Sequence, residues 1–384
     1  MDKIRYQEFQ DEVVNLRRQL HSQPESSLQE TETSRFVEEY LNDLGLETKR
    51  IGENGIVAMI WSNNPNAKTI GLRAEMDAIP VQEENDFAWK SKNDGLMHAC
   101  GHDAIMASVL VTTKVCVQNR KLLNNNVKVF FQPAEENGKG TDIMIDGGVM
   151  SDPKVDYFTM LHFANDAPLG VELNKGASSA AIGSIKINIS GVASHWALPD
   201  NGVDTIDISR KVLDLIYSLN DQYKSESPFV IGIGRINGGR ASNVIADETL
   251  LEGTLRAIKV SDYNELRELL LSGIDKIQKN TKAKIEIEIT DPPILPIISD
   301  SNLVDIGLLA GDEVFGNESR LVDSEYLSGD SAADYFNFAR GIFFVFTAEK
   351  PNEHNYPLHN GNFDIDENIL WKSVAVLHKY ILKL

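Results

Sequence analysis

The sequence is poor in cysteine and in basic residues. Two cysteines among 384 residues leave no room for the dense disulfide framework of small secreted proteins. The chain has 37 basic and 57 acidic residues, for a formal net charge of −20. Because nucleic acids and anionic membranes bind basic surfaces, this balance argues against both as partners.

Long hydrophobic runs are also missing. The most apolar stretches, such as GIFFVF at 341–346, are far too short to cross a bilayer. The first residues, MDKIRYQEFQDEVV, lack the apolar segment of a secretory signal. With 42% hydrophobic residues, only 13 prolines and no low-complexity tract, the chain is expected to be a cytoplasmic globular protein of two domains.

The local patterns predict an α/β fold. Apolar residues at helical spacing predict helices over 3–21 and 31–44, the second ended by Gly45. Between helical stretches lie short β-rich runs: IVAMI, TIGLR, VKVFF, VDYFTML and GIFFVF. This alternation is typical of a mostly parallel sheet covered on both faces, and such sheets bind ligands at the carboxyl ends of their strands.

The middle of the chain has a different order. Alternating and amphipathic segments over 179–291 read β-α-β-β-α-β, the order of a ferredoxin-like unit. Prolines at 292, 293 and 296 end this pattern. We therefore predict a discontinuous first domain, 1–178 and 292–384, with the ferredoxin-like unit inserted.

The tetrad CGHD points to a metal. Cys100 and His102 are two residues apart at the predicted head of a helix, and thiolate with imidazole favours zinc-like ions. The helix N-terminus is expected to lower the pKa of the thiol and so favour metal binding. A buried cysteine beside a helix-capping histidine is the alternative interpretation.

Two adjacent carboxylates, Glu135 and Glu136, follow the run VKVFF in the segment FQPAEEN. On extended chain they would point in opposite directions, so that one binds metal while the other stays free. A free carboxylate beside a metal site can take a proton from water and pass it to a leaving nitrogen. Taken alone, the pair could equally be two solvated acids of an acidic protein.

His162 and His359 also follow β-rich runs, and each alone is more often a structural histidine than a ligand. Together with Cys100, His102 and Glu136 they make five ligands, enough for two ions. Asp77, also placed after a β-rich run, could orient a ligating imidazole or simply stabilise a turn.

Six motifs together resemble the metal-dependent aminoacylase and amidohydrolase family, which is related to two-zinc carboxypeptidases. They are LRRQLHSQPE (16–25), LRAEMDAIPVQEE (72–84), MHACGHD (97–103), FQPAEENGKG (131–140), SHWALPDNGVDTI (194–206) and LHNGNF (358–363). The resemblance implies a zinc-peptidase-like catalytic domain with an inserted lid that pairs two subunits. It also implies that Cys100, His102, Glu136, His162 and His359 are the metal ligands, that Glu135 is the general base and that Asp77 stands behind the site.

The resemblance further assigns residues to the substrate. It implies that His195 reaches the scissile carbonyl, often across the dimer, and that Asn243 and Arg256 hold the substrate, with Gly329 nearby. On strand alternation alone, Arg256 would be an exposed surface residue. The chain departs from the family pattern at Glu75, at Ile105 and after Gly329, where Asp330-Ser331-Ala332 replaces Glu-Asp-Phe.

These features predict hydrolysis of the amide bond of N-acyl amino acids with two divalent ions. Zinc is favoured by the thiol, and manganese, cobalt or nickel suit the same ligands. One alternative is a dipeptidase or carboxypeptidase that uses the same metals on short peptides. Another is a binding protein whose altered pocket no longer turns over acyl-amino acids.

Overall fold

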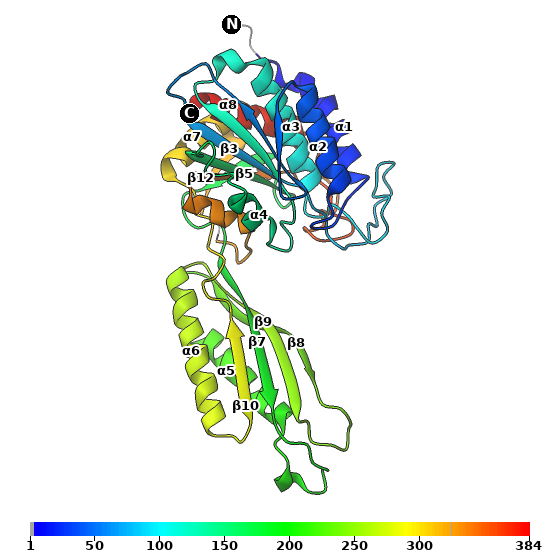
Figure 1. Cartoon of the computed structure of the whole chain (residues 1–384), viewed down its shortest axis with the longest axis vertical. Coiled ribbons are helices and arrows are strands. Elements are labelled where there is room, and N and C mark those ends of the chain that lie inside the picture. Colours follow the sequence, from blue (N-terminus) through cyan, green and yellow to red (C-terminus); the bar gives the residue numbers. More distant parts are fainter. Residues whose placement is uncertain (1–3, 324) are drawn as a thin grey trace. The chain divides into compact units, whose positions relative to one another are not determined.

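The computed structural model describes residues 4–323 and 325–384. The chain forms two compact units, coloured along the sequence in Figure 1. Unit 1 comprises residues 1–176, 298–323 and 330–384, and unit 2 comprises 177–297 and 324–329. The sequence patterns place the boundaries at 178/179 and 291/292, and they do not foresee the return of 325–329 to unit 2.

Unit 1 is built on an eight-stranded sheet with the order β1-β2-β4-β3-β5-β12-β6-β11. Its strands are β1 (Thr48–Ile51), β2 (Gly55–Ile60), β3 (Thr69–Glu75), β4 (Asn126–Gln132), β5 (Tyr157–Ala164), β6 (Gly170–Asn174), β11 (Ser319–Val322) and β12 (Arg340–Thr347). The neighbours β4/β3, β3/β5, β5/β12 and β6/β11 are parallel, while β1/β2, β2/β4 and β12/β6 are antiparallel. The predicted mostly parallel sheet is therefore confirmed.

Helices cover this sheet on two faces. On one face α3 packs against α1 and α8, and α7 packs against α8; on the other, α4 and the 3-10 helix η5 lie together. The helices are α1 (Gln10–His21), α2 (Thr31–Asp43), α3 (His102–Gln118), α4 (Gly140–Asp146), η5 (Ser331–Asn337), α7 (Ser301–Phe315) and α8 (Ile369–Lys383). The helix predicted over 3–21 begins only at Gln10, because Tyr6–Phe9 forms a separate 3-10 turn, a common way for a helix to start.

Unit 2 has its own antiparallel sheet, order β10-β7-β9-β8, and two helices. Its elements are β7 (Ala181–Ser190), α5 (Thr205–Gln222), β8 (Phe229–Gly238), β9 (Glu248–Ala257), α6 (Val260–Lys279) and β10 (Lys284–Ile289). Along β7 the isoleucines 185, 187 and 189 are buried against a core shared with α5 and α6, while Lys186 is exposed. The predicted β-α-β-β-α-β order is present.

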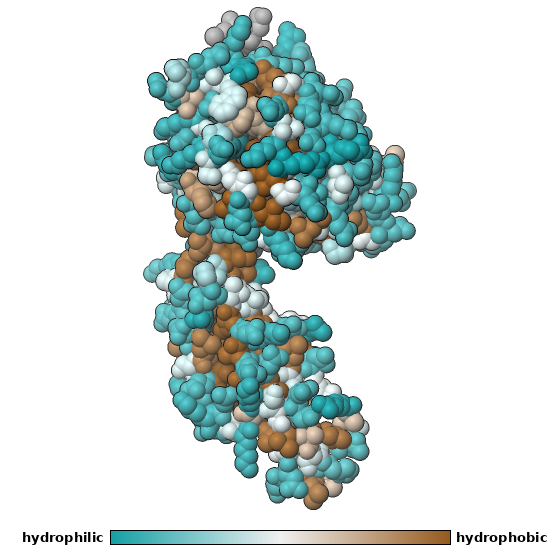
Figure 2. Space-filling view, viewed as in Figure 1, coloured by the Kyte–Doolittle hydropathy of each residue, from teal (hydrophilic) through white to brown (hydrophobic). Residues whose placement is uncertain are grey.

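Both units expose apolar side chains. Figure 2 shows brown, apolar areas on the visible face of unit 2. Several large apolar side chains of this unit are well exposed, among them Trp196, Leu198, Ile206, Tyr217 and Ile236. No helix in the described part of the chain has both the length and the apolarity needed to cross a membrane.

Candidate metal centre

The five predicted ligands come together in unit 1. Cys100 ends the loop before α3, His102 is the first residue of α3, and Glu136 lies in the turn after β4. His162 is on β5, and His359 lies in the loop between β12 and α8. The fold thus gathers ligands from separate segments at one edge of the sheet, as strand ends in an open α/β sheet do.

Their ligand atoms form three overlapping groups. Within each group all the ligand atoms lie within 4.8 Å of one another. The groups are Cys100/His102/His162, Cys100/Glu136/His359 and His102/Glu135/Glu136. Because the groups share members, the five predicted ligands and Glu135 make one continuous cluster.

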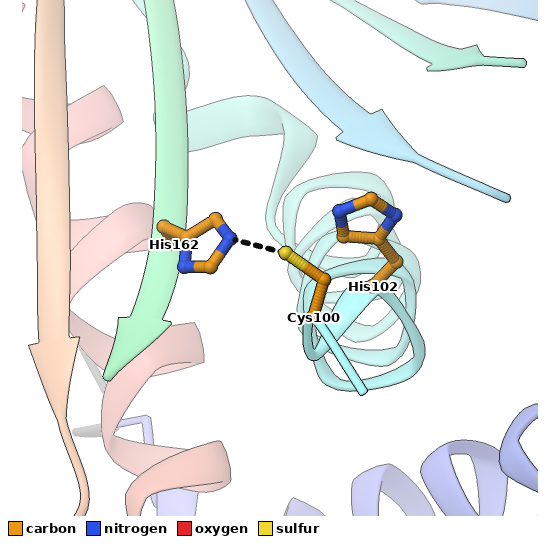
Figure 3. Close-up of side chains that lie close together, drawn as sticks. All are labelled: Cys100, His102 and His162. Carbon is orange, nitrogen blue, oxygen red and sulfur yellow. Dashed lines mark hydrogen bonds between the residues drawn. The ribbon is translucent and has the colours of Figure 1, made fainter. Parts of the chain in front are cut away.

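Individual distances locate the centre of this cluster. The Cys100 sulfur points at the His162 ring, 3.5 Å from Nε2, with His102 beside it at the start of α3 (Figure 3). Oε1 of Glu136 lies 3.9 Å from Nε2 of His102 and 3.6 Å from Nε2 of His359. That oxygen is buried and has no hydrogen-bond partner among the described residues, which fits an oxygen that takes a cation instead.

Hydrogen bonds to backbone carbonyls determine which nitrogen is protonated in two of the imidazoles. Nδ1 of His102 lies 2.8 Å from the carbonyl oxygen of Asp77, and Nδ1 of His162 lies 2.8 Å from that of Phe163. A carbonyl oxygen only accepts, so Nδ1 carries the proton in both rings. When either ring is neutral, its Nε2 therefore has the lone pair that can bind a metal.

Of the two interpretations of Asp77, the hydrogen bonds favour the one in which its carboxylate stabilises a turn. Its backbone carbonyl, and not its carboxylate, receives the His102 proton, while the nearest carboxylate oxygen is 3.5 Å from Nδ1. The carboxylate instead accepts the backbone N–H of Glu135 at 3.1 Å and of Glu136 at 3.0 Å, and the Ser27 hydroxyl at 2.7 Å. Although burial acts in the opposite direction, His102 and these donors lower the pKa of Asp77 to about 2.

The two adjacent glutamates do not lie on extended chain, so that prediction is wrong. The strand β4 ends at Gln132, and Ala134 adopts a left-handed conformation with φ 52°. A non-glycine residue rarely adopts this conformation, and here it turns the chain so that both carboxylates face His102. The bonds from Asp77 hold the turn in place.

The thiol pKa also differs from the expectation. Burial raises the pKa of Cys100 to about 12, outweighing the opposite effect of His102. Burial likewise lowers the pKa of His162 to about 4, so its ring is neutral at pH 7. A thiol in this setting needs a neighbouring cation to ionise, and a bound metal ion supplies one.

The general-base candidate, Glu135, has neighbours that the sequence did not reveal. The Ser331 backbone N–H and hydroxyl lie 3.4 and 3.5 Å from its Oε1. Burial and the nearby Asp330 carboxylate raise the pKa of Glu135 well above its usual range. A base held above its usual pKa is better matched to proton transfer near neutral pH.

A buried arginine links the departures from the family pattern. Arg73 donates to Gln132 at 2.8 Å, to Glu75, and to Asp330 at 3.4 Å. Glu75 and Asp330 therefore share one guanidinium and belong to a single ion-pair network. Ile105, the other departure in this unit, is fully buried in α3 and serves the core.

The predicted substrate residues lie in unit 2, and not all together. His195 forms a β-bridge with Val244, next to Asn243, so these two predicted residues are neighbours. Arg256 lies near the opposite end of β9, where Nη1 donates to the Leu327 carbonyl at 2.8 Å. The stretch of antiparallel strand from Glu248 to Arg256, eight residue-to-residue steps, spans about 27 Å.

Gly329 also belongs to unit 2. A Cβ added to it would come within 2.4 Å of the Ile182 side chain on β7. The residue thus makes a close approach to the strand, which accounts for a glycine there without a substrate contact.

The donor set fits two divalent ions. It offers one thiol, the imidazoles of His102, His162 and His359, and the carboxylates of Glu135 and Glu136. Sulfur and nitrogen ligands suit zinc-like metals, and six donors exceed the four that one structural zinc takes. Glu136 belongs to two of the ligand groups, and its Oε1 is buried without a hydrogen-bond partner among the described residues.

Comparisons with known proteins extend over both units. The sequence model of peptidase family M20/M25/M40 matches residues 71–383. Thermostable carboxypeptidase 2 of Saccharolobus solfataricus is 33% identical over 381 residues, covering 97% of this chain and 94% of that protein. Hippurate hydrolase of Campylobacter jejuni is 29% identical over 385 residues, covering 98% and 97%. A solved dinuclear metal-binding peptidase of Bacillus subtilis is 26% identical with a TM-score of 0.84, covering 98% of each chain.

Proposed function

The chain belongs to peptidase family M20/M25/M40, and on this premise we propose that it hydrolyses the amide bond of N-acyl amino acids. The products would be a free amino acid and a carboxylic acid. The observation that carries the proposal is the joining of five metal-ligand side chains and Glu135 in one cluster. Its curated relatives include a hippurate hydrolase and an N-acetyl-L-cysteine deacetylase, both named for N-acyl amino acid substrates.

Cys100, His102, Glu136, His162 and His359 would hold two divalent ions, with zinc favoured by the thiol. Bound there, the ions would supply Lewis acidity toward the amide carbonyl and toward water. Glu135 takes the proton from the attacking water and returns it to the leaving nitrogen. Ser331, which donates to Oε1 of Glu135, keeps that carboxylate directed while it gains and loses the proton.

In this proposal the substrate is also held by unit 2. His195 donates to the developing oxyanion, and Arg256 pairs with the free carboxylate of the amino acid. Because His195 with Asn243 lies about 27 Å or more along the ladder from Arg256, one copy of unit 2 cannot bring all three to one small substrate. We therefore propose a homodimer in which a second copy supplies the missing group.

The cytoplasm remains the proposed location, in keeping with two free cysteines, Cys100 and Cys116. Peptide hydrolysis at the same site is the second candidate function. The 33% identity to a carboxypeptidase, higher than to hippurate hydrolase, favours it. The metal ligands and Glu135 would serve a peptide bond in the same way, so the distinction lies in the acyl side of the substrate.

Amino-acid release from a substrate panel separates these functions. The panel contains N-acetyl, N-benzoyl and longer-chain N-acyl amino acids beside dipeptides, with the metal content of the protein quantified. Release from acyl-amino acids supports the proposal, whereas release from dipeptides alone would favour the peptidase. Tight binding without release at full metal occupancy would instead indicate a binding protein.

A further inference from the structure

Glu30 is a fully buried carboxylate outside the metal cluster. It occupies the N-cap position of α2, yet its side chain makes no capping bond to that helix. Glu25 does this work instead, accepting the backbone N–H groups of Glu32 at 3.2 Å and Thr33 at 2.8 Å. The Glu30 carboxylate is therefore free to reach elsewhere.

It reaches the turn that carries the two catalytic glutamates. Oε1 of Glu30 accepts the backbone N–H of Ala134 at 2.7 Å, across 104 residues of sequence. Its other oxygen accepts the side-chain amide of Asn54 at 3.1 Å. A carboxylate is worth burying here only if such donors replace the lost water, and both of its oxygens have one.

The Ala134 N–H is a sensitive point of the turn. Ala134 is in the left-handed region, which a non-glycine residue keeps only when its surroundings hold it there. The three consecutive N–H groups of Ala134, Glu135 and Glu136 are all bound by buried carboxylates, the first by Glu30 and the next two by Asp77. The Ala134 carbonyl accepts the Gly140 N–H at 3.0 Å.

We propose that Glu30 is a positioning residue for catalysis, which acts through the Ala134 peptide to aim Glu135 and Glu136. This inference rests on the proposed hydrolytic function. Without the Glu30 oxygen, the Ala134 N–H is buried without a partner, and the turn relaxes toward a conformation that alanine prefers. Since a displacement of about 1 Å at reacting groups costs on the order of a hundredfold in rate, a small relaxation is enough to matter.

The test compares Glu30→Ala, Glu30→Gln and Glu25→Ala in the full-length, metal-loaded protein. Glu25→Ala is the matched control. It removes the side chain that accepts the N–H groups of Glu32 and Thr33 at the start of α2, and it leaves the hydrogen bonds of the turn at Ala134 in place. Its backbone carbonyl, which accepts the Ala78 N–H, is kept. Glu30→Gln keeps an oxygen for the Ala134 N–H.

Two readouts are needed, and one does not depend on turnover. Hydrogen exchange over the segment 130–138 should become faster in Glu30→Ala and stay unchanged in Glu25→Ala and Glu30→Gln. With a hydrolysed substrate, kcat of Glu30→Ala should fall about 10- to 100-fold while KM changes little. Glu30→Gln should stay within about threefold of the wild type, because the neutral amide keeps the acceptor.

Unchanged exchange over 130–138 in Glu30→Ala would overturn the proposal, as would a fall in kcat without a change in exchange. If Glu30→Ala does not fold, Glu30→Gln decides: a fall in its kcat of more than about tenfold, with exchange over 130–138 unchanged, would overturn the proposal, because the acceptor for the Ala134 N–H is kept. A wild-type protein that hydrolyses no substrate of the panel would refute the proposed function. The exchange result would still report whether Glu30 holds the turn.

Discussion

The thiol sulfur of Cys100 lies 3.5 Å from Nε2 of His162, although the two residues are 62 positions apart in the chain. One is placed by the loop before α3 and the other by β5. The two side chains are hydrogen-bonded to each other in a buried setting that raises the pKa of the thiol and lowers that of the imidazole. A metal ion that both residues ligate would stabilise the thiolate and take the lone pair of the neutral imidazole.

Replacing Cys100 by serine should weaken metal binding. A hydroxyl is a poorer ligand for zinc-like ions than a thiolate, so we expect the dissociation constant of at least one ion to rise on the order of tenfold or more. The matched control is Cys116→Ser, since Cys116 is a free cysteine buried in the core and remote from the ligand groups. Competition with a chromophoric chelator measures the metal dissociation constants of both variants. Equal metal affinities in the two would contradict the assignment of Cys100 as a ligand.

Replacing Asp77 by alanine should impair both folding and hydrolysis. The change leaves the N–H groups of Glu135 and Glu136 without their acceptor. Leaving a buried donor unsatisfied lowers the free energy of unfolding by about 1–3 kcal/mol. Amino-acid release should fall about 10- to 100-fold, the usual effect of losing a residue that orients ligands. Ser27→Ala, which removes only one donor to the same carboxylate, should have a much smaller effect. Comparable losses in the two variants would argue against a turn held by Asp77.

His21 should make the stability of the protein depend on alkaline pH. Burial alone would lower its pKa, but hydrogen bonds with Asp103 and Glu83 raise it to about 9, above the ordinary 6.5. The pKa of His21 is higher in the folded than in the unfolded protein. Its contribution to the free energy of unfolding is therefore complete below pH 6.5 and disappears as the pH rises through 9. It amounts to about 3 kcal/mol for a shift of this size.

Chemical denaturation of the wild type and His21→Gln tests this point. The difference in the free energy of unfolding should be largest at pH 6 and should shrink toward pH 10. A difference that stays constant over this range would show that His21 is not the titrating group.

The exposed edge of unit 2 should carry the proposed dimer contact. Ile236 on the edge strand β8 is 51% exposed, and a charge there should raise the dimer dissociation constant on the order of tenfold or more. Sedimentation of Ile236→Glu checks this, with Leu309→Glu on α7 as a control of similar exposure (57%) in unit 1. A wild type that sediments as a monomer at micromolar concentration would contradict the dimer.

The sequence could predict much of the fold because the signals were local. The strand runs of unit 1, Gly45 at the end of α2 and the β-α-β-β-α-β order of unit 2 all follow from short-range patterns. The five candidate ligands could be proposed because cysteine, histidine and paired glutamates at strand ends are uncommon in ordinary cores, and because the family resemblance implies the same residues. Gathering them in one cluster required the whole fold.

The remaining features depend on contacts that no local pattern encodes. The left-handed turn at Ala134 has no glycine to announce it, and the carboxylates that hold it come from Glu30 and Asp77, far away in the chain. The pKa of Cys100 depends on burial by residues from other segments. The return of residues 325–329 to unit 2 likewise follows from tertiary packing.

The most direct test of the central claim follows metal content and amino-acid release together, in the wild type and in Glu135→Gln. Each protein is stripped with a chelator and then titrated with zinc. We predict that the wild type regains release as it takes up about two ions, because the ligand groups fit two. Glu135→Gln should bind the same number while its release stays lower by on the order of a hundredfold or more. Undiminished release from the stripped wild type, or near-normal release by metal-loaded Glu135→Gln, would contradict the account.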